Sequence, residues 1–172
     1  MLRIRSEKMA DFDAIHTFVQ EAFTTAPVSD GKEQDLVRQL RRSKGYLPAL
    51  ALLVEQQGEI VGYLLLTRFF FAPNEGEPLQ ALLMGPLCVR EEYRGRKIGS
   101  MLTRVALNKA RSFGFERVFL VGDPAYYGRF GFRPATDFAI ENSNGIPARC
   151  FLALELAKGA LAVGGGRLSV ML

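Results

Sequence analysis

The segment from Leu79 to Val121 constrains the fold more than any other part of the sequence. A long apolar run, Leu79 to Val89, is followed by a basic loop with two glycines, a helical pattern and a second apolar run, Arg117 to Val121. A strand, a helix and a second strand in this order form a βαβ unit, whose two strands lie parallel in one sheet. The sequence therefore predicts a mixed α/β fold.

The part of the chain before this unit predicts two helices and an antiparallel meander. Apolar residues recur at intervals of three and four from Phe12 to Phe23, which is the period of an amphipathic helix. A second helix is expected to end near Arg42, with Asp30 as its N-cap. Short turns join three β-rich runs, which should therefore pair as a meander. These runs are 49–55, 59–72 and 79–89.

Length and composition are those of one ordinary domain. The 172 residues are 48% hydrophobic and 23% charged, which supplies a core and excludes intrinsic disorder. Two cysteines, Cys88 and Cys150, exclude a disulfide framework and a cysteine-based zinc site, so no metal is expected. No apolar run approaches the about 18 residues that a membrane span needs. We therefore expect a single domain over residues 1–172, cytoplasmic and not bound to membranes.

The positive charge is concentrated in one segment. The formal net charge is +4, and the stretch from Arg90 to Arg104 holds five basic and two acidic side chains. A nucleic-acid surface would spread its basic residues and interleave them with aromatic ones. A concentrated basic patch instead suits a compact anion such as a phosphorylated ligand, so no nucleic-acid partner is expected.

The basic loop leads directly into a predicted helix. A helix N-terminus offers unpaired backbone N–H groups and a partial positive charge, which together bind anions. Gly95 and Gly99 allow close approach of a ligand to the backbone. The loop matches neither a P-loop nor a Gly-x-Gly-x-x-Gly motif, and taken alone it could be a solvated turn. The residues expected to bind the anion are Arg94, Gly95, Arg96, Lys97, Ile98, Gly99 and Ser100.

A Gly-Pro pair interrupts the strand that precedes this loop. Proline cannot donate to a strand ladder and glycine often marks a bulge, so pairing should break at Gly85 and Pro86. The backbone groups of the next residues, Leu87, Cys88 and Val89, could then pair with an extended amide-bearing ligand. Coenzyme A joins such an arm to a pyrophosphate, so the sequence predicts a coenzyme A site.

With these motifs, the sequence resembles the GNAT superfamily of N-acetyltransferases. The family pattern Arg/Gln-x-x-Gly-x-Gly/Ala aligns with Arg94 to Gly99, and Asp123 to Phe132 resembles the family's block near the sulfur. The resemblance covers residues 2 to 156, with Lys97 where the family usually has glycine. It implies a mixed, mostly antiparallel sheet of about six to seven strands, flanked by helices and splayed between the fourth and fifth strands.

The resemblance also implies direct transfer of an acetyl group from acetyl-CoA to a primary amine in a ternary complex. A backbone N–H between Leu87 and Val89 would stabilise the oxyanion. The family's tyrosine lies four residues before the glycine of its Gly-Phe pair, here Gly131, which selects Tyr127 as the general acid and leaves Tyr126 as its neighbour. Tyr127 would protonate a leaving thiol whose pKa is about 8.5.

Several alternatives stay open from the sequence alone. The same fold could hold acyl-CoA as a non-catalytic sensor or scaffold, and Tyr127 could be an ordinary buried tyrosine. The sequence does not choose among the carboxylates that could accept a proton from the amine. These are Glu21, Glu33, Glu55, Glu91 and Glu92.

The acceptor site is expected beside two loops, Phe23 to Gly31 and Asn74 to Pro78. Neither loop carries an acidic run that would demand a polycation, so the acceptor is left as the amine of a small molecule or a peptide. Pairing of two chains through Arg149 to Glu155 is also left open.

Overall fold

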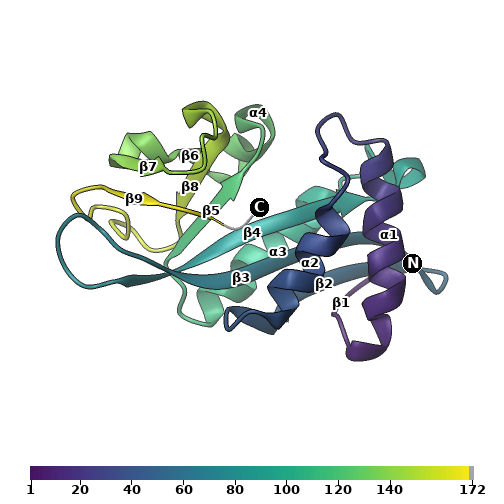
Figure 1. The fold of residues 1–172 in the computed structure, drawn as a ribbon. Helices are drawn as coiled ribbons and strands as arrows, with labels where there is room; N and C mark the ends of the chain where they lie inside the picture. Colours follow the sequence, from purple (N-terminus) through teal and green to yellow (C-terminus); the bar gives the residue numbers. More distant parts are fainter. Residues whose placement is uncertain (171–172) are drawn as a thin grey trace. The chain divides into compact units, whose positions relative to one another are not determined.

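The computed structural model describes residues 1–170 and is a mixed α/β structure (Figure 1). A seven-stranded sheet has the order β1-β2-β3-β4-β5-β8-β6, and β7 pairs with β9 in a small second sheet. The strands are β1 (Leu2–Ser6), β2 (Tyr46–Gln56), β3 (Glu59–Phe71), β4 (Leu79–Val89), β5 (Arg117–Val121), β6 (Arg133–Pro134), β7 (Ile140–Asn142), β8 (Phe151–Glu155) and β9 (Gly166–Leu168).

Four α-helices and five short 3-10 helices connect these strands within the described residues. The α-helices are α1 (Phe12–Thr24), α2 (Glu33–Arg42), α3 (Ile98–Ser112) and α4 (Pro124–Tyr127). The 3-10 helices are η1 (Met9–Asp11), η2 (Glu91–Tyr93), η3 (Gly128–Phe130), η4 (Ala135–Phe138) and η5 (Ala148–Cys150). None of the helices in residues 1–170 is long and apolar enough to cross a membrane.

The expected fold class is confirmed. The seven-stranded sheet is mostly antiparallel, and its one parallel pair joins β4 to β5 across the βαβ unit that the sequence predicts. This parallel pairing consists of two residue pairs, Leu82 with Val118 and Leu83 with Phe119. So short a pairing fits the expected splay between these strands.

The chain divides into two compact units, each with its own core. Unit 1 consists of Met1–Thr67 and Gly85–Lys109, and unit 2 consists of residues 68–84 and 110–170. The unit boundaries fall inside β3, β4 and α3, so these three elements contribute to both units.

In unit 1, helices cover both faces of the strands (Figure 1). The predicted stripe of α1 is buried, with Ile15 and Val19 fully inaccessible, and it packs with α2 against alternate strand residues such as Leu53. On the opposite face α3 lies very close to β3, because a Cβ atom at Gly62 would come within 3.0 Å of Ile98. The glycine in β3 thus permits the close approach of α3.

A buried ionic cluster joins Glu7, the residue after β1, to α2, β2 and β3. The carboxylate of Glu7 accepts two hydrogen bonds from Arg41, at 2.9 and 2.7 Å, and one each from the hydroxyls of Tyr46 and Tyr63. The Arg41 guanidinium also lies 4.0 Å from the centre of the Phe12 ring. Burial and the Glu7 carboxylate raise the pKa of both tyrosines, which therefore remain hydrogen-bond donors.

The core of unit 2 is aromatic. The ring of Phe119 stacks on Phe151 at a centroid distance of 5.8 Å and contacts Phe69 and Phe71 at 5.8 and 5.9 Å. Residues of β5 and β8 alternate toward this cluster, and the apolar residues after β8, such as Leu161, complete it.

Several local expectations require correction. Asp30 does not cap α2, because α2 begins at Glu33 with Lys32 as its N-cap, and the Asp30 carboxylate instead accepts a hydrogen bond from the Lys32 N–H at 2.8 Å. Strand β2 begins at Tyr46 rather than at residue 49, because Tyr46 already pairs with Thr67 of β3. The register of this pairing shifts between Tyr46 and Ala51. The two- and three-residue strands β6 and β7 were not predicted because they are too short to show a period.

Candidate functional site

The basic loop is a tight turn between η2 and α3 in unit 1. Gly95 and Lys97 both have left-handed backbone conformations, with φ of +76° and +63°. The carbonyl of Lys97 accepts the first helical hydrogen bond, from the N–H of Met101 at 2.9 Å, so Lys97 is the residue from which α3 starts. Ile98 is buried and anchors the helix start, whereas residues 94–97 are exposed.

The conformation of Lys97 explains why glycine is usual at this position in the family whose motif the loop resembles. A left-handed conformation costs a residue with a side chain about 1–2 kcal/mol, whereas glycine adopts it without that cost. Lys97 occupies the glycine-like conformation in spite of its side chain. The turn is therefore retained, and the exposed lysine adds a positive charge to it.

The guanidinium of Arg94 is engaged by backbone carbonyls. It donates to the carbonyls of Ala22 at 2.7 Å and Thr25 at 3.2 Å, at the C-terminal end of α1, and to that of Val89 at 3.2 Å, at the end of β4. A cation suits the negative end of a helix dipole. The sequence predicts that Arg94 contacts phosphate, and in the structure its guanidinium joins the loop to α1 and β4.

The two other basic residues of the loop are exposed. The Arg96 guanidinium lies 4.8 Å from the centre of the Tyr93 ring, which restricts its motion, and Lys97 extends from the turn itself. These two side chains remain the candidates for charge contacts with an anion at the start of α3.

Side-chain burial alternates along the end of β4. Leu87 and Val89 are half-buried, whereas Cys88 between them is buried in the core beneath α1 and α2. Gly85, with φ of +143°, begins this part of the strand. Burial raises the pKa of the Cys88 thiol, so it stays protonated and is not a nucleophile.

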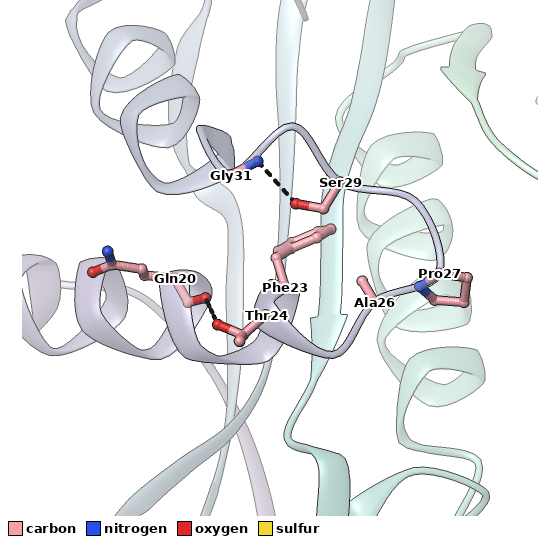
Figure 2. Close-up of a pocket in the computed structure, with 7 residues that line it drawn as sticks. All are labelled: Gln20, Phe23, Thr24, Ala26, Pro27, Ser29 and Gly31. Carbon is pink, nitrogen blue, oxygen red and sulfur yellow. Dashed lines mark hydrogen bonds between the residues drawn. The ribbon is translucent and has the colours of Figure 1, made fainter.

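An open pocket of about 430 Å³ lies between the end of α1 and the loop that leads to α2 (Figure 2). Figure 2 shows the ring of Phe23 directed toward Ser29. Two hydrogen bonds order the rim: Thr24 donates to the carbonyl of Gln20 at 3.0 Å, and the Gly31 N–H donates to Ser29 at 3.0 Å. The pocket is lined by Gln20, Phe23, Thr24, Ala26, Pro27, Ser29 and Gly31.

The structure distinguishes the five candidate carboxylates. Glu55 is bound by Arg5 at 2.5 Å, and Glu21 is exposed and lies 3.7 Å from Arg90. Only in Glu33 is a carboxylate oxygen, Oε2, both buried and without a hydrogen-bond partner within residues 1–170. The remaining two, Glu91 and Glu92, are exposed.

Tyr127 belongs to unit 2 and lies in α4, which begins where the sequence predicts. The Asp123 carboxylate accepts a hydrogen bond from the N–H of Ala125 at 2.9 Å and caps α4, with Pro124 as the first helical residue. After η3 the chain turns at Gly131, whose φ is +94°. This short helical segment fixes the backbone of Tyr127.

The ring of Tyr127 is held by aromatic edges and by a glycine. It lies edge-on to Tyr126 at 4.9 Å and to Phe132 at 5.9 Å, and a Cβ atom at Gly122 would collide with it. Within residues 1–170 its hydroxyl has no hydrogen-bond partner. Burial raises the pKa of the phenol above its ordinary value of 10, so Tyr127 keeps its proton at neutral pH.

Unit 1 therefore contains all ten predicted cofactor-binding residues together with Glu33, and unit 2 contains Tyr127. Sequence reasoning did not identify the interaction between Arg94 and the end of α1. A basic residue in a loop gives no sign that a helix about 70 residues earlier supplies its acceptors.

Comparison with known proteins identifies relatives over most of the chain. The model of a family described as acetyltransferase (GNAT) family matches residues 12–132. The uncharacterized N-acetyltransferase YhbS of Escherichia coli K12 is 35% identical over 132 residues, which cover 77% of this chain and 74% of YhbS. The uncharacterized N-acetyltransferase YjhQ of the same organism is 40% identical over 103 residues, which cover 60% of this chain and 56% of YjhQ.

Solved structures show the same fold. The crystal structure of YhbS from Escherichia coli in complex with CoA has a TM-score of 0.85 and 28% sequence identity, covering 98% of this chain and 88% of that one. A GNAT family acetyltransferase from Brucella melitensis in complex with acetyl-CoA has a TM-score of 0.74 and 26% identity, covering 91% and 89% of the two chains.

Proposed function

We propose that this chain, which belongs to the acetyltransferase (GNAT) family, transfers the acetyl group of acetyl-CoA to a primary amine by direct attack in a ternary complex. The observation that carries the proposal is the left-handed basic turn at the start of α3, which η2 joins to the end of β4, in a chain whose structural relatives are complexes with CoA and acetyl-CoA. The turn supplies an anion site and the strand end supplies a backbone slot.

The cofactor would bind through backbone groups of unit 1. The N–H groups at the start of α3, from Ile98 to Ser100, would receive the pyrophosphate, with Arg96 and Lys97 beside it. The end of β4, at Leu87, Cys88 and Val89, would pair with the amides of the pantetheine arm. Arg94 would act as a positioning residue, because its guanidinium joins the loop to α1.

The chemical step requires an oxyanion site and a proton donor. A neutral amine attacks the thioester carbonyl, and a backbone N–H between Leu87 and Val89 would stabilise the oxyanion that forms. As the C–S bond breaks, the phenol of Tyr127 would donate a hydrogen bond and then a proton to the sulfur. Burial raises the pKa of Tyr127, so the phenol carries its proton at neutral pH and is available as the donor.

Cofactor binding is tested by calorimetric titration with acetyl-CoA and with coenzyme A. Lys97→Glu reverses an exposed charge on the turn that is proposed to bind phosphate. It should raise the Kd for acetyl-CoA at least tenfold, which corresponds to a loss of about 1.4 kcal/mol of binding free energy. Lys158→Glu is the matched control, since Lys158 is exposed and lies outside unit 1. Absence of binding by the unaltered protein would refute the proposal.

Catalysis is separated from the sensor alternative by a pair of tyrosine variants. Tyr127→Phe removes only the hydroxyl and should lower kcat about 100-fold, as loss of a general acid does, while acetyl-CoA affinity is unchanged. Tyr126→Phe removes the neighbouring hydroxyl and should leave kcat within about twofold. Equal rates for both variants would remove Tyr127 from the mechanism, and absence of any amine acetylation would favour a non-catalytic acyl-CoA-binding module.

A further inference from the structure

Gly122, the residue after β5, lies against the ring of Tyr127. A Cβ atom at Gly122 would come within 2.8 Å of Cδ2 of that ring, and closer still to Cε2. Two non-bonded carbon atoms attract best at about 3.5–4.0 Å, so so short a separation is a steric collision. The Tyr127 ring therefore occupies the space that a side chain at position 122 would fill.

The backbone conformation of Gly122 does not itself require glycine. Its φ lies outside the left-handed region, unlike that of Gly131 further along the same segment, so a residue with a side chain could adopt it. The Gly122 N–H donates to the carbonyl of Cys150 at 2.9 Å, directly after the pairing of β5 with β8. Since this hydrogen bond fixes the backbone, glycine is needed at position 122 for the room that it leaves to the ring.

The neighbours of Tyr127 leave its ring little freedom to move away from Gly122. Between ring centres, Tyr126 lies edge-on at 4.9 Å and Phe132 edge-on at 5.9 Å. Phe130 lies tilted at 6.4 Å. Phe132 is buried, and a packed core side chain does not yield without cost. A side chain at position 122 would therefore displace the phenol instead of packing beside it.

Gly128, the residue after Tyr127, provides a contrast. Beyond its chain neighbours and the backbone of its own helical turn, a Cβ atom at Gly128 would meet no atom of residues 1–170 within 4 Å. Its φ of −57° and ψ of −30° are those of an ordinary helix, and the residue is exposed. Alanine can therefore replace Gly128 without strain, whereas at Gly122 the same methyl group collides with the ring.

Resting on the proposed acetyl transfer, in which Tyr127 protonates the sulfur, we propose that Gly122 is a positioning residue for this proton transfer. The space left by its missing side chain holds the phenol in the place from which the hydroxyl reaches the sulfur. A general acid must lie within hydrogen-bond reach of its acceptor atom, and a misplacement of about 1 Å can lower a rate about 100-fold. Filling this space should therefore stop proton donation although the hydroxyl is still present.

The step that Gly122 serves is balanced in atoms and electrons. The C–S bond breaks with its electron pair on sulfur, the O–H bond of Tyr127 breaks, and its proton forms an S–H bond. Solvent then reprotonates the phenolate, in exchange for the proton that the amine loses to solvent. The net products are the N-acetylated amine and coenzyme A as the thiol.

The first test follows the Tyr127 phenol by NMR, in protein labelled with carbon-13 at the tyrosine Cζ atoms. Its resonance is identified by its loss in Tyr127→Phe. In the unaltered protein this resonance should shift more with coenzyme A than with desulfo-coenzyme A, because only coenzyme A brings a sulfur to the hydroxyl. In Gly122→Ala this sulfur-dependent shift should be lost, while the calorimetric Kd for coenzyme A stays within about twofold.

Gly128→Ala is the matched control, because it adds the same methyl group on the other side of Tyr127, and it should retain both the shift and the Kd. A sulfur-dependent shift that survives in Gly122→Ala, or that is lost equally in Gly128→Ala, would overturn the proposal. A larger rise in the Kd of Gly122→Ala would also contradict it, because Gly122 would then act on cofactor binding.

A second measurement separates the ring contact from a general effect on the fold. Overpacking should lower the Tm of Gly122→Ala by at least about 3 °C. Tyr127→Ala removes the ring, so in that background Gly122→Ala should lower the Tm by less than about 1 °C. Equal changes in Tm with and without the ring would rule out the contact, as would failure of the double variant to fold. If Gly122→Ala folds only together with Tyr127→Ala, the contact is supported.

Failure of the proposed function gives a different result. If the unaltered protein binds coenzyme A without a sulfur-dependent shift, the role of Tyr127 is refuted and the role of Gly122 with it. Absence of coenzyme A binding refutes the proposed function itself. Failure of the inference alone leaves the shift in the unaltered protein and also in Gly122→Ala.

Discussion

The two units of the molecule bury different chemistry. All five buried polar or charged residues within the described part of the chain lie in unit 1, whereas the core of unit 2 is apolar and centred on stacked phenylalanine rings. Polar groups in a core need fixed partners, while apolar packing requires only shape and volume. Unit 1 thus holds the buried hydrogen-bonding groups, and it also carries the proposed cofactor site. The five residues are Glu7, Gln34, Thr67, Ser100 and Thr103.

The charged groups of unit 1 hold its elements together. The Glu7 carboxylate is inaccessible, and all its hydrogen-bond donors come from the protein. Replacing Glu7 should therefore change stability. The following predictions test the contrast between the units in order of expected effect.

The largest effect is expected for Glu7→Gln. Removing the charge leaves Arg41, itself nearly buried, without its ion-pair partner, and breaking a buried pair costs about 3–5 kcal/mol. Urea unfolding should show this loss, while Glu59→Gln, at an exposed position, should lie within about 0.5 kcal/mol of the unaltered protein. A loss below about 1 kcal/mol would mean that the cluster tolerates an unpaired Arg41.

A smaller loss is expected from the aromatic core of unit 2. Phe119→Leu removes the ring that contacts three others and should cost about 1–3 kcal/mol, with Phe113→Leu at an exposed site as control. Because we propose one domain over residues 1–172, this variant and Glu7→Gln should move the same single unfolding transition. Two separate transitions would show that the units unfold independently.

Acid should destabilise unit 1 through a carboxylate that the protein keeps charged. The hydrogen bonds from Arg5 lower the pKa of Asp11 from its ordinary 3.8 to about 2. Its contribution is therefore present above about pH 4–5 and is lost as the pH falls toward 2. Asp11→Asn should remove about 1 kcal/mol at pH 7 and little at pH 2, measured by urea unfolding at each pH. An equal loss at pH 7 from Asp13→Asn, which is exposed, would contradict this assignment.

The smallest effect is expected at the turn before α3. Lys97→Gly removes the cost of a left-handed side chain, partly offset by the greater freedom of glycine in the unfolded chain, and should stabilise the protein by about 0.5–1 kcal/mol. Tm should rise by about 1–4 °C. Lys97→Ala removes the same charge without this gain, so equal Tm values for the two variants would contradict the conformational explanation.

Elements with strong local signals were predicted at or near their observed bounds. Strands β4 and β5 have the expected limits, and Asp123 and Pro124 begin α4 as expected. In each case the information lies within a few residues, in an apolar run, a capping side chain or a proline at the first helical position. The same local patterns placed the basic turn at the start of α3.

The sequence alone thus determined the order of the longer elements, the mixed sheet and the position of the basic turn at the start of α3, because period, capping and turn chemistry act between neighbours along the chain. Only the tertiary structure decided that Arg94 binds the end of α1, that Lys97 adopts a left-handed conformation, and that Glu33 alone among five carboxylates has a buried oxygen without a partner. Burial and hydrogen-bond partners come from segments distant in sequence, and no local pattern records which segments will meet.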